Sequence, residues 1–316
     1  MTRRVGPIAP IQWFINAINV GAGHAKPLLG GTYLLLVSAV AALILVGIVV
    51  GMFLDGGNTD PSLDPAKMAK AMLPVLVVAA AVPAFVIAGI AMLVHNAHRN
   101  APARVSDAFA GLRGGRAFHL LLLVVVPLGG LWLNGVITDA FAGPGYREAQ
   151  QAAMAEVMKT GNFGALGTLP QPENSGLMML LSIALNLLTY ALQVFSAIAV
   201  VIGGRTAWSA IGSTLLGIVR NPLASLMAGV LAIVFLVAVV IGSLLLMLFA
   251  ALLSAALGAI GGVLSLLLAL GFVTVAGLLW VAWGYFGWRE MISDEGLPPE
   301  MPASGPGQTP PDQFAA

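Results

Sequence analysis

The chain has 316 residues, and charged residues make up 9% of them against about 25% in an average protein. Hydrophobic residues reach 59% and the formal net charge is +1, which leaves too little polar surface for a soluble globule. These values argue against a soluble enzyme, a nucleic-acid-binding protein and a mostly disordered chain. Cys is absent, which excludes disulfides, thiolate metal sites and cysteine nucleophiles.

Long apolar runs predict six membrane-spanning helices, because about 20 apolar residues cross a hydrocarbon core about 30 Å thick. The expected fold is an all-α polytopic transmembrane bundle. The last run has 65 residues without Asp, Glu, Lys or Arg, and it predicts two spans of roughly 26 residues with a turn near 254–262. Three shorter spans, and thus seven in all, are the alternative. The runs cover residues 28–53, 71–94, 118–138, 177–202 and 223–287.

The loops between these runs predict the orientation. Under the six-span topology, ten Lys or Arg residues lie on one side and four on the other. Positive loops stay in the cytoplasm, so both termini are expected there, in a bacterial inner membrane. The expected organisation is a cytoplasmic segment with an in-plane helix (1–27), a six-span domain (28–288) and a disordered cytoplasmic tail (289–316). On the non-cytoplasmic side, a helix is expected from Tyr146 to Gly161 in the loop 142–176.

A short amphipathic segment precedes three of the spans, and each is expected to lie in the headgroup layer with its apolar face toward the lipid. An in-plane helix followed by a two-span hairpin would then be used three times. The apolar stripes are Ile11, Phe14, Ile15 and Ile18, then Val105, Phe109 and Leu112 after a Ser106/Asp107 cap, then Trp208, Ile211, Leu215 and Ile218.

One face of the span at 177–202 is polar at membrane depth, so it is expected to meet other helices or a wet cavity. The face can line a path for a polar solute, or it can form hydrogen bonds between helices, with Asn134 as a partner in the preceding span. The predicted polar intramembrane face consists of Asn134, Ser182, Asn186, Tyr190 and Gln193.

Basic side chains gather at the cytoplasmic ends of the spans and predict a collar that contacts lipid headgroups. His95, His98 and His119 lie nearby; no acid or Cys stands at ligand spacing, so they are assigned to the collar rather than to a metal. The collar consists of Arg99, Arg104, Arg113, Arg116, Arg205 and Arg220.

Catalytic, metal-binding and cofactor-binding residues are not predicted. The spans contain no Asp, Glu, Lys or Arg, which disfavours ion-coupled transport, and no protease or nucleotide motif is present. Pro74, Pro83 and Pro127 are expected to kink their spans. Trp280, Trp283, Tyr285 and Trp288 are interpreted as an interfacial aromatic belt at the end of the last span.

Residues 200–292 resemble a family of uncharacterised bacterial six-span inner-membrane proteins. The resemblance rests on Trp208, on Arg220-Asn221-Pro222 before a span, and on the ending from Tyr285 to Met291. In layout the family is similar to the membrane domain of glycerophosphoryl diester phosphodiesterases. Here Trp288 and Glu290 replace the family's Tyr and Asp. The resemblance implies six spans and supplies no active site.

The sequence therefore predicts a non-catalytic membrane protein of accessory or lipid-interacting type. Membrane lipids, and a membrane protein not identified by the sequence, are the expected partners. The alternative is an uncoupled facilitator or permease subunit that uses the polar face at 177–202 for a small polar solute.

Overall fold

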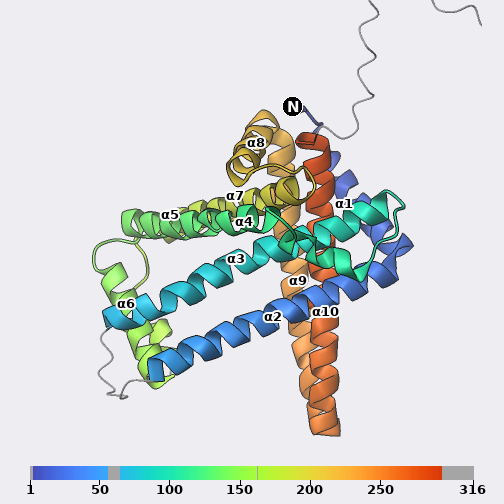
Figure 1. The fold of residues 1–316 in the computed structure, drawn as a ribbon. Helices are drawn as coiled ribbons and strands as arrows, with labels where there is room; N and C mark the ends of the chain where they lie inside the picture. The colour runs from blue at the N-terminus through green and yellow to red at the C-terminus, as the bar shows by residue number, and fades with distance from the viewer. Residues whose placement is uncertain (1–2, 56–64, 162, 294–316) are drawn as a thin grey trace, which may run out of the picture.

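The computed structural model describes residues 3–55, 65–161 and 163–293, and within these ranges the chain is helical, with no strand (Figure 1). Six helical segments there are long and apolar enough to cross a membrane. The predicted all-α polytopic fold is confirmed, and the chain is a multi-pass membrane protein. The stretch 223–287 forms two long helices, so the seven-span alternative is wrong. The candidate spans are Ala25–Val49, Leu73–His98, Arg116–Phe141, Ser175–Val201, Pro222–Leu257 and Ala259–Met291.

The helices follow one another in three units, each a short helical segment and a hairpin of two spans. The first unit contains α1 (Ala9–Gly23), α2 (Ala25–Asp55) and α3 (Pro65–His98). The second contains η1 (Val105–Leu112), α4 (Arg116–Leu122), α5 (Val125–Phe141) and α7 (Ser175–Val201), with α6 (Tyr146–Thr160) and η2 (Phe163–Thr168) between its spans. The third contains α8 (Ala207–Arg220), α9 (Pro222–Leu257) and α10 (Ala259–Met291). The predicted order of elements is thus present.

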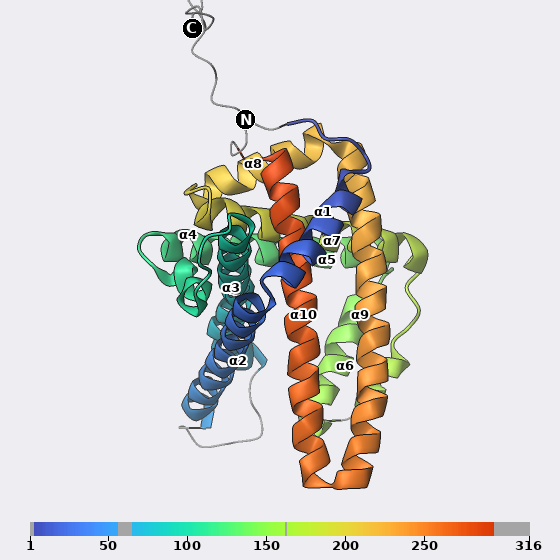
Figure 2. The same ribbon diagram turned by 90° about the vertical axis from the view of Figure 1, so that its right-hand side faces the viewer.

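The three hairpins meet at one end of the molecule and diverge toward the other (Figures 1 and 2). Burial follows this arrangement: the buried side chains of α3, α7 and α10 lie mainly in residues 81–97, 193–201 and 278–291. We call this region, with α1, η1 and α8, the convergent end. The opposite ends of the spans, with α6 and the turn at Gly258, are the open end.

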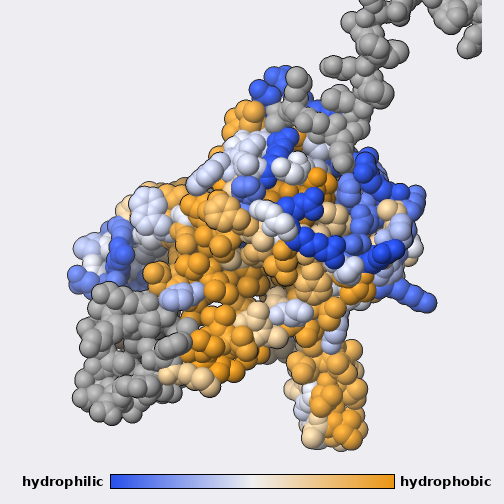
Figure 3. Space-filling view, in the orientation of Figure 1, coloured by the Kyte–Doolittle hydropathy of each residue, from blue (hydrophilic) through white to orange (hydrophobic). Residues whose placement is uncertain are grey.

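Toward the open end, α9 and α10 carry long, aliphatic and exposed side chains. Leu245, Leu252 and Ile260 on α9 and α10 are 62%, 61% and 68% exposed. A bilayer is as apolar as these side chains, so they need no protein neighbour there. Figure 3 shows the matching surface, with hydrophobic residues over the spans down to the turn between α9 and α10, and hydrophilic residues over the convergent end and near α6.

Several boundaries differ from the sequence-based expectation. The last two spans have 36 and 33 residues, longer than expected, because a tight turn at Gly258, with φ 57° and ψ −130°, replaces the broad turn predicted at 254–262. The third helix begins at Pro65, inside the predicted loop. The tail does not begin at 289, because α10 reaches Met291 and Ile292 and Ser293 are buried; residues 294–316 of the predicted disordered tail lie outside the described ranges.

Proline explains the break in the span that contains α4 and α5. Pro127 has no N–H to donate to the carbonyl of Leu123 four residues earlier, and the helix breaks there, with α4 ending at Leu122 and α5 beginning at Val125. By contrast, α3 continues through both Pro74 and Pro83. The helix predicted in the loop 142–176 is α6, and it ends before Gly161, whose φ of 69° is a conformation that favours glycine.

Candidate functional site

The first short helix, α1, lies across α9 and α10 (Figure 2). Its buried residues are Pro10, Trp13 and Ala17. The predicted apolar stripe is on another face, and Ile11, Ile15 and Ile18 are 41–45% exposed. These three residues are on the outside of the protein, but Phe14, the fourth member of the predicted stripe, packs edge to face against Phe235 and Trp283. The residues that fix α1 to the protein were not predicted.

The other two short segments follow the same pattern. On α8 the buried residues are small (Ala207, Ala210, Thr214 and Gly217), while Trp208 of the predicted stripe is 65% exposed. On η1 the buried residues are Ala108, Ala110 and Gly111, while Val105 and Leu112 of the stripe are exposed. Small side chains allow close helix approach, so η1 and α8 pack through small residues. The remaining stripe residues Phe109, Ile211 and Ile218 are half-buried, so the predicted stripes are only partly exposed.

Asp107 has a different capping role from the one predicted. The segment η1 is a 3₁₀-helix whose N-cap residue is Arg104. Asp107 accepts hydrogen bonds from the Arg104 backbone N–H at 2.9 Å and from the Asn96 amide of α3 at 3.0 Å. It caps the segment from inside the first turn and ties it to α3, so the predicted Ser106/Asp107 N-cap is corrected.

Asn221, between α8 and α9, fixes the N-terminal segment that precedes α1. Its side-chain oxygen accepts a hydrogen bond from the Val5 N–H at 2.8 Å. Its amide nitrogen donates to the carbonyls of Arg3 and Gly217 at 2.8 and 2.9 Å. Because Asn221 is 3% exposed, these bonds are protected from water and hold residues far apart in sequence together.

The aromatic residues near the end of α10 form part of the core, which corrects the predicted interfacial belt. Trp283, Tyr285 and Trp288 are 7%, 1% and 2% exposed. The Trp283 indole donates to the Pro10 carbonyl at 3.0 Å, and the Trp13 indole donates to Glu290 Oε2 at 2.7 Å. Buried indole N–H groups usually have such partners, and these two bonds attach α1 to α10, whereas Trp288 Nε1 is buried without a partner among the described residues.

An apolar cavity of about 350 Å³ lies between α7, α9 and α10, with Trp13 of α1 at its edge. Most of its lining is aliphatic or aromatic, and several polar atoms in the lining are already bonded. The indole N–H groups of Trp13 and Trp283 donate to Glu290 and to the Pro10 carbonyl. The Ser225 hydroxyl donates to the Ile218 carbonyl at 3.3 Å. The cavity therefore offers a hydrocarbon surface. The lining includes Ala184, Leu187, Ala191, Ala228, Gly229 and Trp280.

The predicted polar face of α7 is divided among different environments. Asn134 Nδ2 on α5 donates to Asn186 Oδ1 on α7 at 3.2 Å, so the predicted partner is confirmed. Tyr190 is 53% exposed and lines the apolar cavity, whereas Gln193 is 4% exposed and its Nε2 has no partner among the described residues. Ser182 is half-buried. The structure thus brings Asn134 and Asn186 together, but it does not assemble all five side chains around one polar cavity.

Most of the predicted arginine collar is exposed near the convergent end. Arg99, Arg104, Arg113, Arg116 and Arg220 are exposed, and Arg205 is half-buried. The Arg205 guanidinium donates to the carbonyl of Ile292 at 3.4 Å. One collar member is therefore also a contact to the last turn of the chain.

Two of the three histidines, His95 and His98, contact residues of α10, and His119 is half-buried. His95 is 9% exposed, and its Nδ1 lies 3.0 Å from the Tyr285 hydroxyl. His98 Nε2 contacts the guanidinium of Arg289. The part of the chain that the structure describes contains no group of three potential metal ligands.

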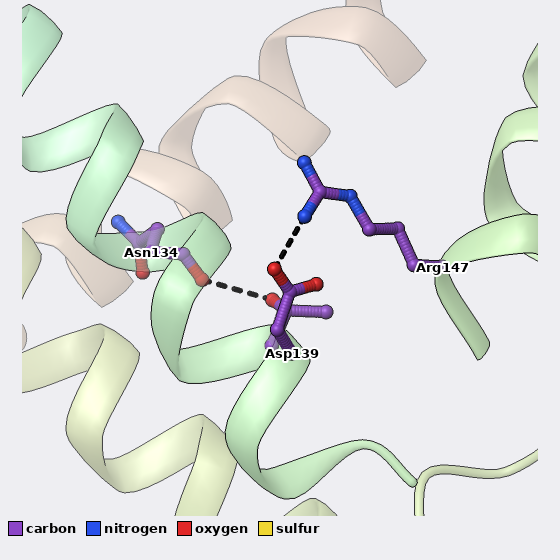
Figure 4. Close-up of polar contacts among 4 residues, drawn as sticks. Asn134, Asp139 and Arg147 are labelled. Carbon is purple, nitrogen blue, oxygen red and sulfur yellow. Dashed lines mark hydrogen bonds and ion pairs between the residues drawn. The ribbon is translucent and has the colours of Figure 1, made fainter. Parts of the chain in front are cut away.

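An ion pair connects the end of α5 at the open end to α6. Asp139 contacts Arg147 of α6, and Thr138 one residue earlier donates to the carbonyl of Asn134 at 2.9 Å (Figure 4). The side chains of Asp139 and Arg147 are 42% and 62% exposed. Asp139 is thus a helix-end residue with a surface partner.

A scan against protein-family models, a search of curated proteins and a search of solved structures each found no match to this chain. The assignment of a function therefore depends on the cavity, the hydrogen bonds and the exposed surfaces described above.

Proposed function

We propose that this protein is a non-catalytic, lipid-interacting protein of a bacterial inner membrane, in which the cavity between α7, α9 and α10 holds a hydrocarbon chain of a membrane phospholipid. The convergent end and both termini face the cytoplasm. This orientation is supported by the ten Lys and Arg residues that the six-span topology places on that side. Membership in the family of six-span bacterial inner-membrane proteins is proposed from the sequence motifs alone. One of these motifs, Arg220-Asn221-Pro222, contains Asn221, whose side chain holds the segment that precedes α1.

The observation that carries the proposal is the apolar lining of the cavity within membrane-spanning helices. Its volume of about 350 Å³ falls within the usual range for ligand pockets of about 300–1,000 Å³. A polar solute would lose its hydration there without gaining partners, while a lipid chain from the surrounding bilayer would fill it and gain contacts.

The facilitator alternative has less support. It requires a polar path, but Asn134 and Asn186 bond to each other and the cavity beside α7 is apolar. Polar pairs of this kind also serve to join helices. The facilitator remains a prediction, and solute flux through the protein in sealed vesicles would be its test.

The experiment is native mass spectrometry of the full chain released gently from its own membrane, with two matched variants on α9. Ala228→Phe places a ring in the cavity, because Ala228 lines it. Ala238→Phe adds the same group at an exposed position outside the lining. The wild type and Ala238→Phe should retain a phospholipid that Ala228→Phe loses.

Equal retention of phospholipid by Ala228→Phe and the wild type would contradict the proposed occupant. So would a wild-type protein that carries no lipid at all. The same spectra detect a stoichiometric membrane-protein partner, which is the other expected partner. A melting curve for both variants separates loss of lipid from loss of the fold.

A further inference from the structure

A second cavity, of about 450 Å³, lies at the convergent end between α1 and the last turns of α3 and α10. Unlike the apolar cavity, it is bordered mainly by polar and charged side chains. They come from the segment before α1, from α1 itself, and from the ends of α3 and α10. The polar and charged residues of the lining are Arg3, Asn16, Asn19, His98, Arg289 and Glu290.

Arg3 is held at this cavity by its backbone. Its N–H donates to the Met291 carbonyl at 3.0 Å, and its carbonyl accepts from the Asn221 amide at 2.8 Å. Its side-chain Nη2 is nevertheless buried and has no hydrogen-bond partner among the described residues. A buried guanidinium nitrogen without an acceptor is costly, and an anion in the cavity would remove that cost.

The other groups around the cavity also favour an anion. Arg289 supplies a second guanidinium, which contacts His98 Nε2. Asn16 accepts from Gln12 through its side-chain oxygen at 3.2 Å, which leaves its amide hydrogens to donate elsewhere. Among the described residues of the lining, Glu290 is the one carboxylate, and its Oε2 is already engaged at 2.7 Å by the indole N–H of Trp13, a residue outside the lining.

We infer that this cavity is a binding site for a phosphate group, with Arg3 and Arg289 as its two cationic donors and the amides of Asn16 and Asn19 as neutral donors. Guanidinium groups match the geometry of phosphate oxygens and bind them with charge-assisted hydrogen bonds. The phosphate can belong to an anionic lipid headgroup at the membrane surface or to free phosphate in the aqueous phase. The inference is independent of whether the apolar cavity holds a hydrocarbon chain, because the two cavities have no lining residue in common.

The test is the melting temperature of the full chain in a neutral detergent, titrated at constant ionic strength with two probes. One probe is inorganic phosphate, and the other is water-soluble dihexanoyl-phosphatidylglycerol. Dihexanoylglycerol, which has the same acyl chains and no phosphate, controls for the acyl chains and should give no rise. A saturable rise in melting temperature with either probe is expected. A rise with inorganic phosphate identifies a free-phosphate site, and a rise with phosphatidylglycerol alone identifies a headgroup site.

The variant Arg3→Gln should raise the probe concentration that gives half of the rise in melting temperature by about tenfold or more, because it removes a charged donor. It removes no side-chain hydrogen bond of Arg3 within the described residues, so the fold should persist without the probe. The matched control is Arg4→Gln, because Arg4 is exposed and lies outside the lining; its response should equal that of the wild type. The inference is overturned if neither probe stabilises the wild type, or if Arg3→Gln and Arg4→Gln respond alike.

Discussion

Two tryptophans show how differently the two parts of this molecule are built. Trp13, at the convergent end, is 1% exposed, packs on Gly287 and donates a hydrogen bond to Glu290. Trp132, on α5, is 69% exposed. Side-chain contacts and hydrogen bonds fix the convergent end, whereas the spans beyond it are left to the lipid. Stability should therefore be concentrated where the hairpins meet, and the open end should be available to other molecules of the bilayer.

Replacing the two tryptophans by Ala is the strongest way to break this comparison. Trp13→Ala should lower the free energy of unfolding by about 3–5 kcal/mol, because it empties a buried site. Trp132→Ala should change it by less than about 0.5 kcal/mol, as is usual for exposed positions. Unfolding by sodium dodecyl sulfate in mixed micelles gives both values. Similar losses for the two variants would mean that the convergent end has no special share of the stability.

The anchor of the N-terminal segment is the next test. Asn221→Ala should cost about 2–3 kcal/mol, since it leaves buried backbone groups of the anchored segment without partners. Hydrogen exchange should also rise at Val5, whose N–H is bonded to Asn221. Asn174→Ala is the control, because Asn174 is exposed and its side chain does not cap α7. Unchanged exchange at Val5 in Asn221→Ala would refute the anchor.

A smaller effect is expected within the membrane, between α5 and α7. A double-mutant cycle with Asn134→Ala and Asn186→Ala should give a coupling energy of about 0.6 kcal/mol, the average for hydrogen bonds between membrane helices. The same unfolding measurement supplies it. A coupling energy of zero would show that the hydrogen bond does not join the two helices. A coupling of several kcal/mol would place more of the stability away from the convergent end than we expect.

The smallest effect is expected at the open end of α5. Asp139→Asn removes the ion pair with Arg147, and because both side chains are exposed the loss should be below about 1 kcal/mol. The loss should shrink further in high salt, which screens exposed charges. An effect that is large, or that persists in 1 M NaCl, would contradict a surface role for this pair.

The sequence predicted the elements better than it predicted their contacts. Apolar run length and loop charge suffice to find six spans, and the stripes of α1 and α8 identify short helices because their period is that of a helix. The opposite, buried face of α8 carries Ala, Thr and Gly, which are too common in this chain to stand out, and the buried face of α1 depends on one residue, Trp13, between Pro10 and Ala17. The threefold order of a short helix and a two-span hairpin could also be predicted, because it depends on local sequence patterns, as the spans do.

The aromatic residues at the end of α10 show where local pattern failed. A cluster of Trp and Tyr beside Arg289 is typical of a membrane interface, and the sequence does not reveal that α1 lies over it. Only the fold shows that Trp283 donates to Pro10, more than two hundred residues earlier. The two cavities were missed for a related reason, since each is bordered by helices from different units.

The most direct test of the central claim compares distances across units two and three. The chain has no Cys, so paired spin labels can be placed at Leu112 and Leu223, exposed positions at the convergent end, and at Met179 and Leu252, exposed positions at the open end. Double electron–electron resonance in nanodiscs should give a narrow distance distribution for the first pair and a broader one for the second. Equally narrow distributions for both pairs would contradict a molecule held together at one end.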